Sequence, residues 1–372
     1  MNQTIVSYLS QTFGFEATGL ITFGIFLVAI LVIIGFMSAL GGLGTYAERK
    51  ISADMQLRQG PNRVGPYGIL QFLADGVKMI LKEDIVPAEA DKFIFNIAPI
   101  LCVVGVLATF AVLPWSSGFI LSDLNVGIIY LLGVASLVGV GIFLGGYSSN
   151  SKWSMLGGMR GASQIISYEI PVTICILSIV LLSGGLSFTA MAEAQGGGIH
   201  TWFIFHNPFT FIGFFVFFIG ALAETNRAPF DLPEAESELV SGYHTEYTGM
   251  KFAFFALAEY MEIFVVCGVC VTLYLGGYNV PFGIGGESLF GQLLQIGGFI
   301  SKTLVLYYVV IWIRWTLPRL RVDQLMSLCW KYLTPIAMFN LIGCAFWMWA
   351  FDGQSLFNLI FKASSVATGA GH

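Results

Sequence analysis

Four glutamates lie inside or at the end of long apolar stretches of the sequence, where a carboxylate is costly. Glu169 stands within Ser-Tyr-Glu-Ile-Pro, and Glu48 closes the first apolar stretch. Glu259 and Glu262 share a later stretch and are neighbours on one face of a helix, because they are three residues apart. Acids within a membrane span are candidates for function by default. A chain of such buried groups suits proton movement.

Pro171 strengthens the case for Glu169. A proline cannot donate to the carbonyl four residues earlier, that of Ser167, so we expect a kink or local unwinding beside this glutamate. A simpler interpretation stays open for the acids nearest the membrane surface. In that interpretation, Glu262 or Glu48 pairs with a basic residue at the interface.

The stretch 223–251 is the second acidic feature. It carries six carboxylates, namely Glu224, Asp231, Glu234, Glu236, Glu238 and Glu246, against the basic residues Arg227 and Lys251. A run of charges is ordinarily a solvated loop, but aromatic and aliphatic residues are interleaved here and give the segment something to bury. If the part after Pro233 is helical, Glu234 and Glu238 share one face and repel. Crowded carboxylates raise one another's pKa, which holds exchangeable protons near neutral pH.

The stretch 47–92 divides into two pieces. Residues 59–66 are dense in Gly and Pro and predict a shaped loop. Over residues 69–81, apolar side chains recur at helical spacing while Asp75 and Lys78 take other positions, which predicts an amphipathic helix at the membrane surface. Loop and helix together could frame an entrance for a lipid-soluble molecule. The alternative, a helix that merely caps the bundle, stays open.

The elements that position these residues are predicted membrane helices. The sequence is 56% hydrophobic and 10% charged, far from the balance of a soluble domain. Its apolar stretches cover residues 20–46, 93–114, 124–146, 164–183, 209–222, 251–276, 297–315 and 333–351. We therefore predict an all-α integral membrane protein with about eight transmembrane helices and one amphipathic helix on the cytoplasmic side. Residues 1–352 form a single polytopic domain in this prediction, and 353–372 form an external tail.

The basic residues predict the orientation. All of the 17 lysines and arginines except Lys302 and Lys362 fall in alternate connections, which the positive-inside rule places in the cytoplasm. Both termini are then expected on the outer side. The first apolar stretch is too long for a cleavable signal peptide and is followed at once by Glu48-Arg49-Lys50, so we expect it to remain in the mature protein.

Six cysteines are present, and Cys267 and Cys270 form a C-x-x-C pair within a predicted span. No second pair or nearby histidine completes a metal or redox site in the sequence. We interpret these cysteines as small buried apolar residues and predict no bound metal. Any redox cofactor is then expected in another subunit.

Five segments closely resemble the H subunit of bacterial respiratory complex I, the proton-pumping NADH:quinone oxidoreductase. They are residues 47–50, 60–66, 167–171, 223–239 and 242–247. The resemblance covers roughly residues 20 to 350. Ordered motifs of this length are far more specific than a short pattern.

The resemblance implies a membrane subunit at the junction of the membrane arm and the cytoplasmic arm, in the cell inner membrane. Such a subunit forms the membrane-facing part of a chamber for quinone, for example ubiquinone, and is not active alone. FMN, the NADH site and the iron-sulfur clusters belong to partner subunits, and quinone is the substrate. The implied partners are the other subunits of both arms and membrane lipid, with no nucleic acid.

The resemblance also assigns residues, none of them catalytic. Those that line or flank the chamber and docking surface are Arg49, Arg58, Arg63, Asp75, Arg227 and Asp231. Those expected on the proton path are Glu48, Glu169, Glu224, Glu234, Glu236, Glu238, Glu246, Glu259 and Glu262. Quinone reduction takes up two electrons and two protons, so carboxylates with shifted pKa values near the acidic loop are expected to respond.

Two other functions stay open at this point. A ferredoxin-linked complex or a membrane-bound hydrogenase could use a similar subunit as its membrane anchor, without NADH. A free-standing ion transporter would ordinarily show internal repeats with correspondingly broken helices, and no such repeat is visible in the sequence.

Overall fold

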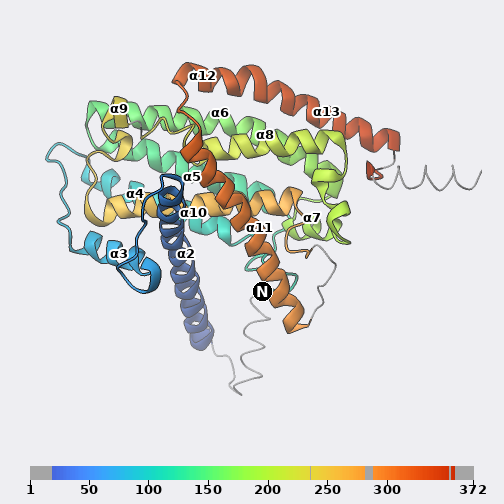
Figure 1. Cartoon of the computed structure of the whole chain (residues 1–372), viewed down its shortest axis with the longest axis horizontal. Helices are drawn as coiled ribbons and strands as arrows, with labels where there is room; N and C mark the ends of the chain where they lie inside the picture. Colours follow the sequence, from blue (N-terminus) through green and yellow to red (C-terminus); the bar gives the residue numbers. More distant parts are fainter. Residues whose placement is uncertain (1–18, 235, 281–287, 352, 357–372) are drawn as a thin grey trace, which may run out of the picture.

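The chain folds into a bundle of long helices (Figure 1), and the computed structural model describes residues 19–234, 236–280, 288–351 and 353–356. Within these residues no strand occurs, and seven helical stretches are long and apolar enough to span a membrane. The long helices are α2 (Gly19–Met55), α4 (Lys92–Phe110), α5 (Gly127–Ser148), α6 (Lys152–Ser183), α10 (Gly249–Tyr274), α11 (Leu289–Thr316) and the continuous stretch Val322–Phe351. With the shorter apolar helix α8 (Pro208–Glu224), they confirm the predicted all-α membrane class.

Shorter elements join these helices. On the side of the acidic loop they are η1 (Pro66–Gly68), α3 (Gln71–Leu81), α9 (Glu236–Leu239) and η4 (Gly242–His244); on the opposite side they are α7 (Phe188–Ala194), η2 (Ile199–Thr201) and η3 (Phe203–Phe205). The stretch Val322–Phe351 itself consists of α12 (Val322–Ser327), a π-helical turn η5 (Leu328–Leu333) and α13 (Thr334–Phe351).

Several predicted boundaries are wrong because helices continue past their apolar parts; α11, for example, begins at Leu289 rather than at 297. Helix α2 runs to Met55, so Glu48 and Arg49 lie in its final turns rather than in a connection. Helix α6 begins at Lys152, well before the predicted start at 164. The α2 extension consists mostly of good helix formers, whereas the α6 extension contains three glycines; in both, charged and polar residues lower the hydropathy without interrupting the helical backbone. Helix α8 is short, as predicted, and Asn207 caps its first turn by accepting from the Thr210 backbone N–H at 2.6 Å.

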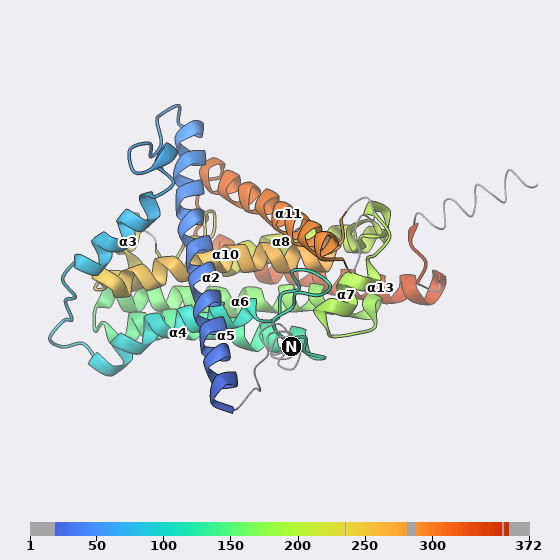
Figure 2. The ribbon, with the colours of Figure 1, turned by 90° about the horizontal axis from the view of Figure 1, so that it is seen from below.

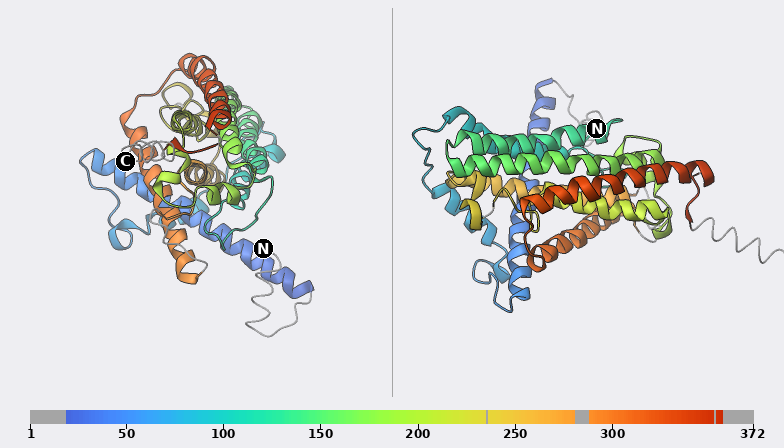
Figure 3. Two further views of the ribbon diagram at one scale, coloured as in Figure 1. Left: turned by 90° about the vertical axis from the view of Figure 1, so that its right-hand side faces the viewer. Right: turned by 90° about the horizontal axis from the view of Figure 1, so that it is seen from above.

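Helices α4, α5, α6, α8, α10 and α13 run side by side, whereas α2 crosses α10 steeply and α11 lies diagonally (Figures 2 and 3). Glycine allows the closest approach of α5 to α6. A Cβ on Gly146 would lie 2.5 Å from the Ser154 carbonyl oxygen, so any larger residue there would push these helices apart. Small residues at such contacts are typical of membrane helix packing.

Helix α3 confirms the helix that was expected over residues 69–81. Phe72 packs against Gly42 of α2, but no residue of α3 is fully buried. Leu73, Val77 and Ile80 are each more than half exposed, at 53%, 55% and 64%. Within the described chain, the apolar face of α3 is therefore uncovered.

The connections that carry the basic residues contact one another. Lys251 pairs with Asp84 at 2.8 Å, which joins the start of α10 to the segment after α3. The Leu320 backbone N–H donates to the Pro229 carbonyl at 3.1 Å, which joins the connection after α11 to the acidic loop. These contacts gather the predicted loop motifs at one end of the bundle. Of the predicted tail, 357–372 lies outside the described residues.

Candidate functional site

Arg227 is the centre of a buried ion cluster at the end of the bundle where the acidic loop lies. Its side chain is 5% exposed, and one guanidinium nitrogen lies 3.4 Å from a Glu48 carboxylate oxygen while the other lies 3.1 Å from a Glu259 oxygen. The guanidinium also lies over the Tyr260 ring, 4.3 Å from its centroid. The cluster thus joins α2, the acidic loop and α10.

Arg314 of α11 completes the charge balance of the cluster. It forms an ion pair with the second oxygen of Glu48, so two arginines face the two carboxylates of Glu48 and Glu259. Buried ions are tolerated only when they are paired in this way. The simpler interpretation of Glu48, pairing with a basic residue, is confirmed in that both its oxygens bind arginine.

Gln164 of α6 fixes the backbone that carries Arg227. Its side-chain nitrogen donates to the carbonyls of Ala223 at 2.7 Å and Phe230 at 2.8 Å, and it is 1% exposed. Asn226, in the same turn, adopts a left-handed conformation with φ 51°. Gln164 was not among the predicted residues. The available signal was a polar side chain near the start of a predicted span, which is costly unless it is hydrogen-bonded.

Glu234 extends the cluster into the loop. It interacts electrostatically with Glu259, accepts from the Tyr243 hydroxyl at 3.4 Å, and lies 3.5 Å from Nδ1 of His244. Burial raises the pKa of Glu234 by penalising its charged form. His244 was not among the predicted residues, because the charge pattern of this stretch does not indicate which neutral side chain contacts its acids. Histidine beside a carboxylate is a common proton-exchanging pair.

The condition under which Glu234 and Glu238 would share a helix face is not met. Helix α9 contains only Glu236–Leu239, and Glu238 instead pairs with Arg160 of α6 at 2.7 Å. The chain turns back so tightly that Gly242, with φ 62°, packs directly against the Pro233 carbonyl, where a Cβ would overlap it. A long helix cannot continue through such a turn. The side chain of Glu236 lies outside the described residues.

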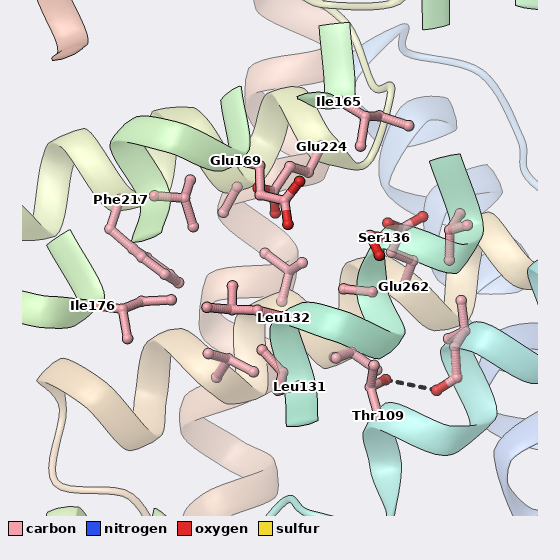
Figure 4. Close-up of a pocket in the computed structure, with 18 residues that line it drawn as sticks. Thr109, Leu131, Leu132, Ser136, Ile165, Glu169, Ile176, Phe217, Glu224 and Glu262 are labelled. Carbon is pink, nitrogen blue, oxygen red and sulfur yellow. Dashed lines mark hydrogen bonds between the residues drawn. The ribbon is translucent and has the colours of Figure 1, made fainter. Parts of the chain in front are cut away.

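A cavity of about 60 Å³ opens between α4, α5, α6, α8 and α10, and three glutamates line it (Figure 4). They are Glu169 of α6, Glu224 of α8 and Glu262 of α10, and Glu224 interacts electrostatically with both others. Ser136 and Thr109 add hydroxyls to a wall that is otherwise mostly apolar. None of the lining residues in the described chain is basic, so Glu262 faces the cavity rather than an interfacial cation. The volume is sufficient for a few water molecules.

Helix α10 connects the ion cluster and the cavity. Glu259 and Glu262 are neighbours on its surface, and the first contacts Arg227 while the second lines the cavity. The structure therefore brings together two groups of predicted residues. The acids at the loop end are Glu48, Glu234 and Glu259, and those in the cavity are Glu169, Glu224 and Glu262.

The other predicted residues lie outside these two groups. Arg49 of α2 pairs with Asp75 of α3 at 2.5 Å, and Asp231 pairs with Arg319 at 2.9 Å, so these pairs hold the loops together. Arg58 and Arg63 are exposed in the connection between α2 and α3. Glu246 is half-buried in the segment before α10.

Helix α6 runs unbroken through Pro171, so the local unwinding expected there does not occur. The carbonyl of Ser167, which the proline leaves without its helical donor, accepts from the Cys329 thiol at 3.1 Å.

The predicted burial of the C-x-x-C pair is confirmed: Cys267 and Cys270 are 1% and 0% exposed, and both are free thiols. Within the described chain, no group of three or more potential metal ligands is found.

Comparison with known proteins assigns the chain to a family. A family model described as NADH dehydrogenase matches residues 27–345. The chain is 46% identical over 352 residues to the H subunit of NADH-quinone oxidoreductase from Anaeromyxobacter dehalogenans, covering 90% of this chain and 85% of that protein. It is 50% identical to the H subunit from Chlorobaculum parvum, with 82% and 87% covered, and 47% identical to NADH-quinone oxidoreductase subunit 8 of Rhodothermus marinus, with 85% and 94% covered. The chain therefore belongs to the family of the NADH-quinone oxidoreductase H subunits.

Proposed function

We propose that this chain is the membrane subunit that walls the quinone chamber of a proton-pumping NADH:quinone oxidoreductase and couples quinone reduction to proton translocation. The observation that carries the proposal is the position of Arg227, which is buried between Glu48 and Glu259 at the end of the bundle where the loop motifs gather. From there, α10 leads through Glu262 to a cavity lined by two further acids.

Electrostatic response is the proposed mechanism of coupling. Reduction of quinone draws two protons and places negative charge near the acidic loop. Glu234, His244 and Glu259 lie in contact there, so a charge change at the loop alters the balance around Arg227. Protonation of Glu259 would weaken its pairing with Arg227, and its neighbour Glu262 then exchanges protons with Glu169 and Glu224 across the cavity. In the assembled complex, this path continues into the other membrane subunits.

The surroundings of the subunit follow from the same proposal. FMN, the NADH site and the iron-sulfur clusters belong to partner subunits of the cytoplasmic arm, which docks on the basic connections. The chain lies in the cell inner membrane with both termini on the outer side. A hydrogenase-type anchor is the alternative, and a nickel-iron subunit that copurifies with the chain would favour it.

Helix α3 is proposed as one side of the quinone entrance, since its apolar side chains are uncovered. A photoreactive quinone analogue is expected to label residues 60–81 in membranes, and mass spectrometry of the labelled peptides checks this. Excess unreactive quinone should abolish the labelling. Labelling confined to the opposite connections, such as 184–206, would reject the proposed entrance.

Glu234 gives a prediction for pH dependence. Because burial raises its pKa, Glu234 holds its proton to higher pH than an ordinary carboxyl group. Glutamine resembles only the protonated form, so Glu234→Gln is expected to match the wild type at the acidic end of the pH range and to differ increasingly as pH rises through the raised pKa. Quinone reduction in membranes between about pH 5 and pH 9 measures the ratio of the two activities. A ratio that is constant across this range contradicts a titrating role for Glu234.

A further inference from the structure

The carbonyl that Pro171 leaves without its helical donor is bound by a distant part of the chain. Cys329 lies in the π-helical turn η5, is 0% exposed, and donates its thiol hydrogen to the Ser167 carbonyl at 3.1 Å. A buried carbonyl without a donor costs free energy. The thiol therefore removes a cost that the proline creates, and it lets α6 continue as one helix.

A second bond joins the same two segments one residue further along α6. The Tyr168 hydroxyl donates to the Leu325 carbonyl at 2.9 Å, and Tyr168 is also 0% exposed. Ser167 and Tyr168 directly precede Glu169, whose carboxyl group reaches the cavity beside Glu224 (Figure 4). The stretch from α12 into η5 thus holds α6 immediately before its glutamate.

Cys329 lies within a π-helical turn, η5. Such turns are rare and occur preferentially at functional sites, because the additional residue in the turn redirects nearby side chains. The Thr334 hydroxyl donates to the Cys329 carbonyl at 2.9 Å and ties the end of this turn to the start of α13. Cys329 is therefore held by its own segment as well as by α6.

We propose that Cys329 is a positioning residue for Glu169. Its bond to Ser167 sets the course of α6 at Pro171 and thereby the direction in which the Glu169 carboxyl group enters the cavity. The inference rests on the proposed role of Glu169 in proton transfer. It gives the segment that precedes α13 a part in coupling, although that segment contributes no residue to the cavity lining.

A double-mutant cycle in the assembled complex tests this inference. Cys329→Ala and Cys329→Val both lack a donor, and valine also fills the space, whereas Cys329→Ser retains a donor. The two variants without a donor are expected to lower coupled quinone reduction about fivefold, since they leave a buried acceptor unpaired. Cys329→Ser is expected to keep at least about half of the activity. In a Glu169→Gln background, Cys329→Val is expected to cause no further loss.

The pH profile separates positioning from plain destabilisation. Cys329→Val moves Glu169 into altered surroundings, so the pH profile of quinone reduction should shift, and this shift should be absent in the Glu169→Gln background. An equal loss from Cys329→Val in both backgrounds would overturn the inference, as would a serine variant as impaired as valine. Full activity of Glu169→Gln alone would instead refute the proposed role of Glu169. Electron transfer from NADH to an artificial acceptor confirms assembly of each variant.

Discussion

Substitution Arg227→Ala is expected to lower quinone reduction more than tenfold while leaving electron transfer from NADH to an upstream artificial acceptor unchanged. The arginine is the shared partner of Glu48 and Glu259, and it is buried together with both. After its removal, Arg314 still neutralises Glu48, but Glu259 loses its ion pair with Arg227. Removing one member of a buried ion pair typically costs about 3–5 kcal/mol. The acidic loop and α10 then lose one of the contacts between them.

Arg227→Lys is the graded test of the same geometry. Lysine keeps the charge, but a single ammonium group cannot reproduce the two-sided contact in which one nitrogen faces Glu48 and the other faces Glu259. Its activity is expected between those of alanine and wild type. Glu193→Ala, at an exposed position in α7 on the opposite side of the bundle, serves as the control for loss of a charge and should be normal. Equal loss of both electron-transfer activities in Arg227→Ala would indicate failed assembly rather than a lost site.

The membrane helices and the acids could be predicted from the sequence because each signal is local. About 20 apolar residues in a row identify a span wherever it packs, and a glutamate within such a stretch is conspicuous in the sequence alone. The periodicity of residues 69–81 likewise predicted α3. The ends of α2 and α6 could not be predicted in this way, because hydropathy stops at the lipid boundary while helical hydrogen bonding does not.

The supporting residues of the site could not be predicted because their partners are distant in sequence. Gln164 is significant only beside the Phe230 carbonyl, 66 positions away. Cys329 is significant only beside Ser167, which is 162 positions away. Pairing of this kind depends on how the helices pack, and no local pattern of residues encodes it. A buried polar side chain in a span indicates that a partner exists, without indicating which one.

Glu259 and Glu262 have different roles on α10, so Glu262→Gln is expected to act on proton transfer rather than on the ion cluster. Glu259 is an ion-pair partner of Arg227, whereas Glu262 lines a cavity without a basic lining residue in the described chain. Glutamine preserves the shape and hydrogen bonding of Glu262 but cannot release a proton. We therefore expect coupled quinone reduction to fall about tenfold or more, as is typical when an essential proton-transfer group is lost. Assembly should be intact, because the neutral amide suits this mostly apolar cavity better than a charge.

Proton pumping by the complex in proteoliposomes, relative to the rate of NADH oxidation, is the decisive measurement for Glu262→Gln. If Glu262 only fills space, both quantities stay normal and the proposed path is wrong. Glu193→Gln makes the same chemical change at an exposed position in α7 and should have no effect. Glu259→Gln provides the contrast within α10, because it removes one of the two ion-pair partners of Arg227 in the described chain and is expected to impair quinone reduction through the ion cluster. If the path is continuous, combining Glu259→Gln with Glu262→Gln should lower pumping by less than the product of the two single effects, since both groups act in series on the same protons.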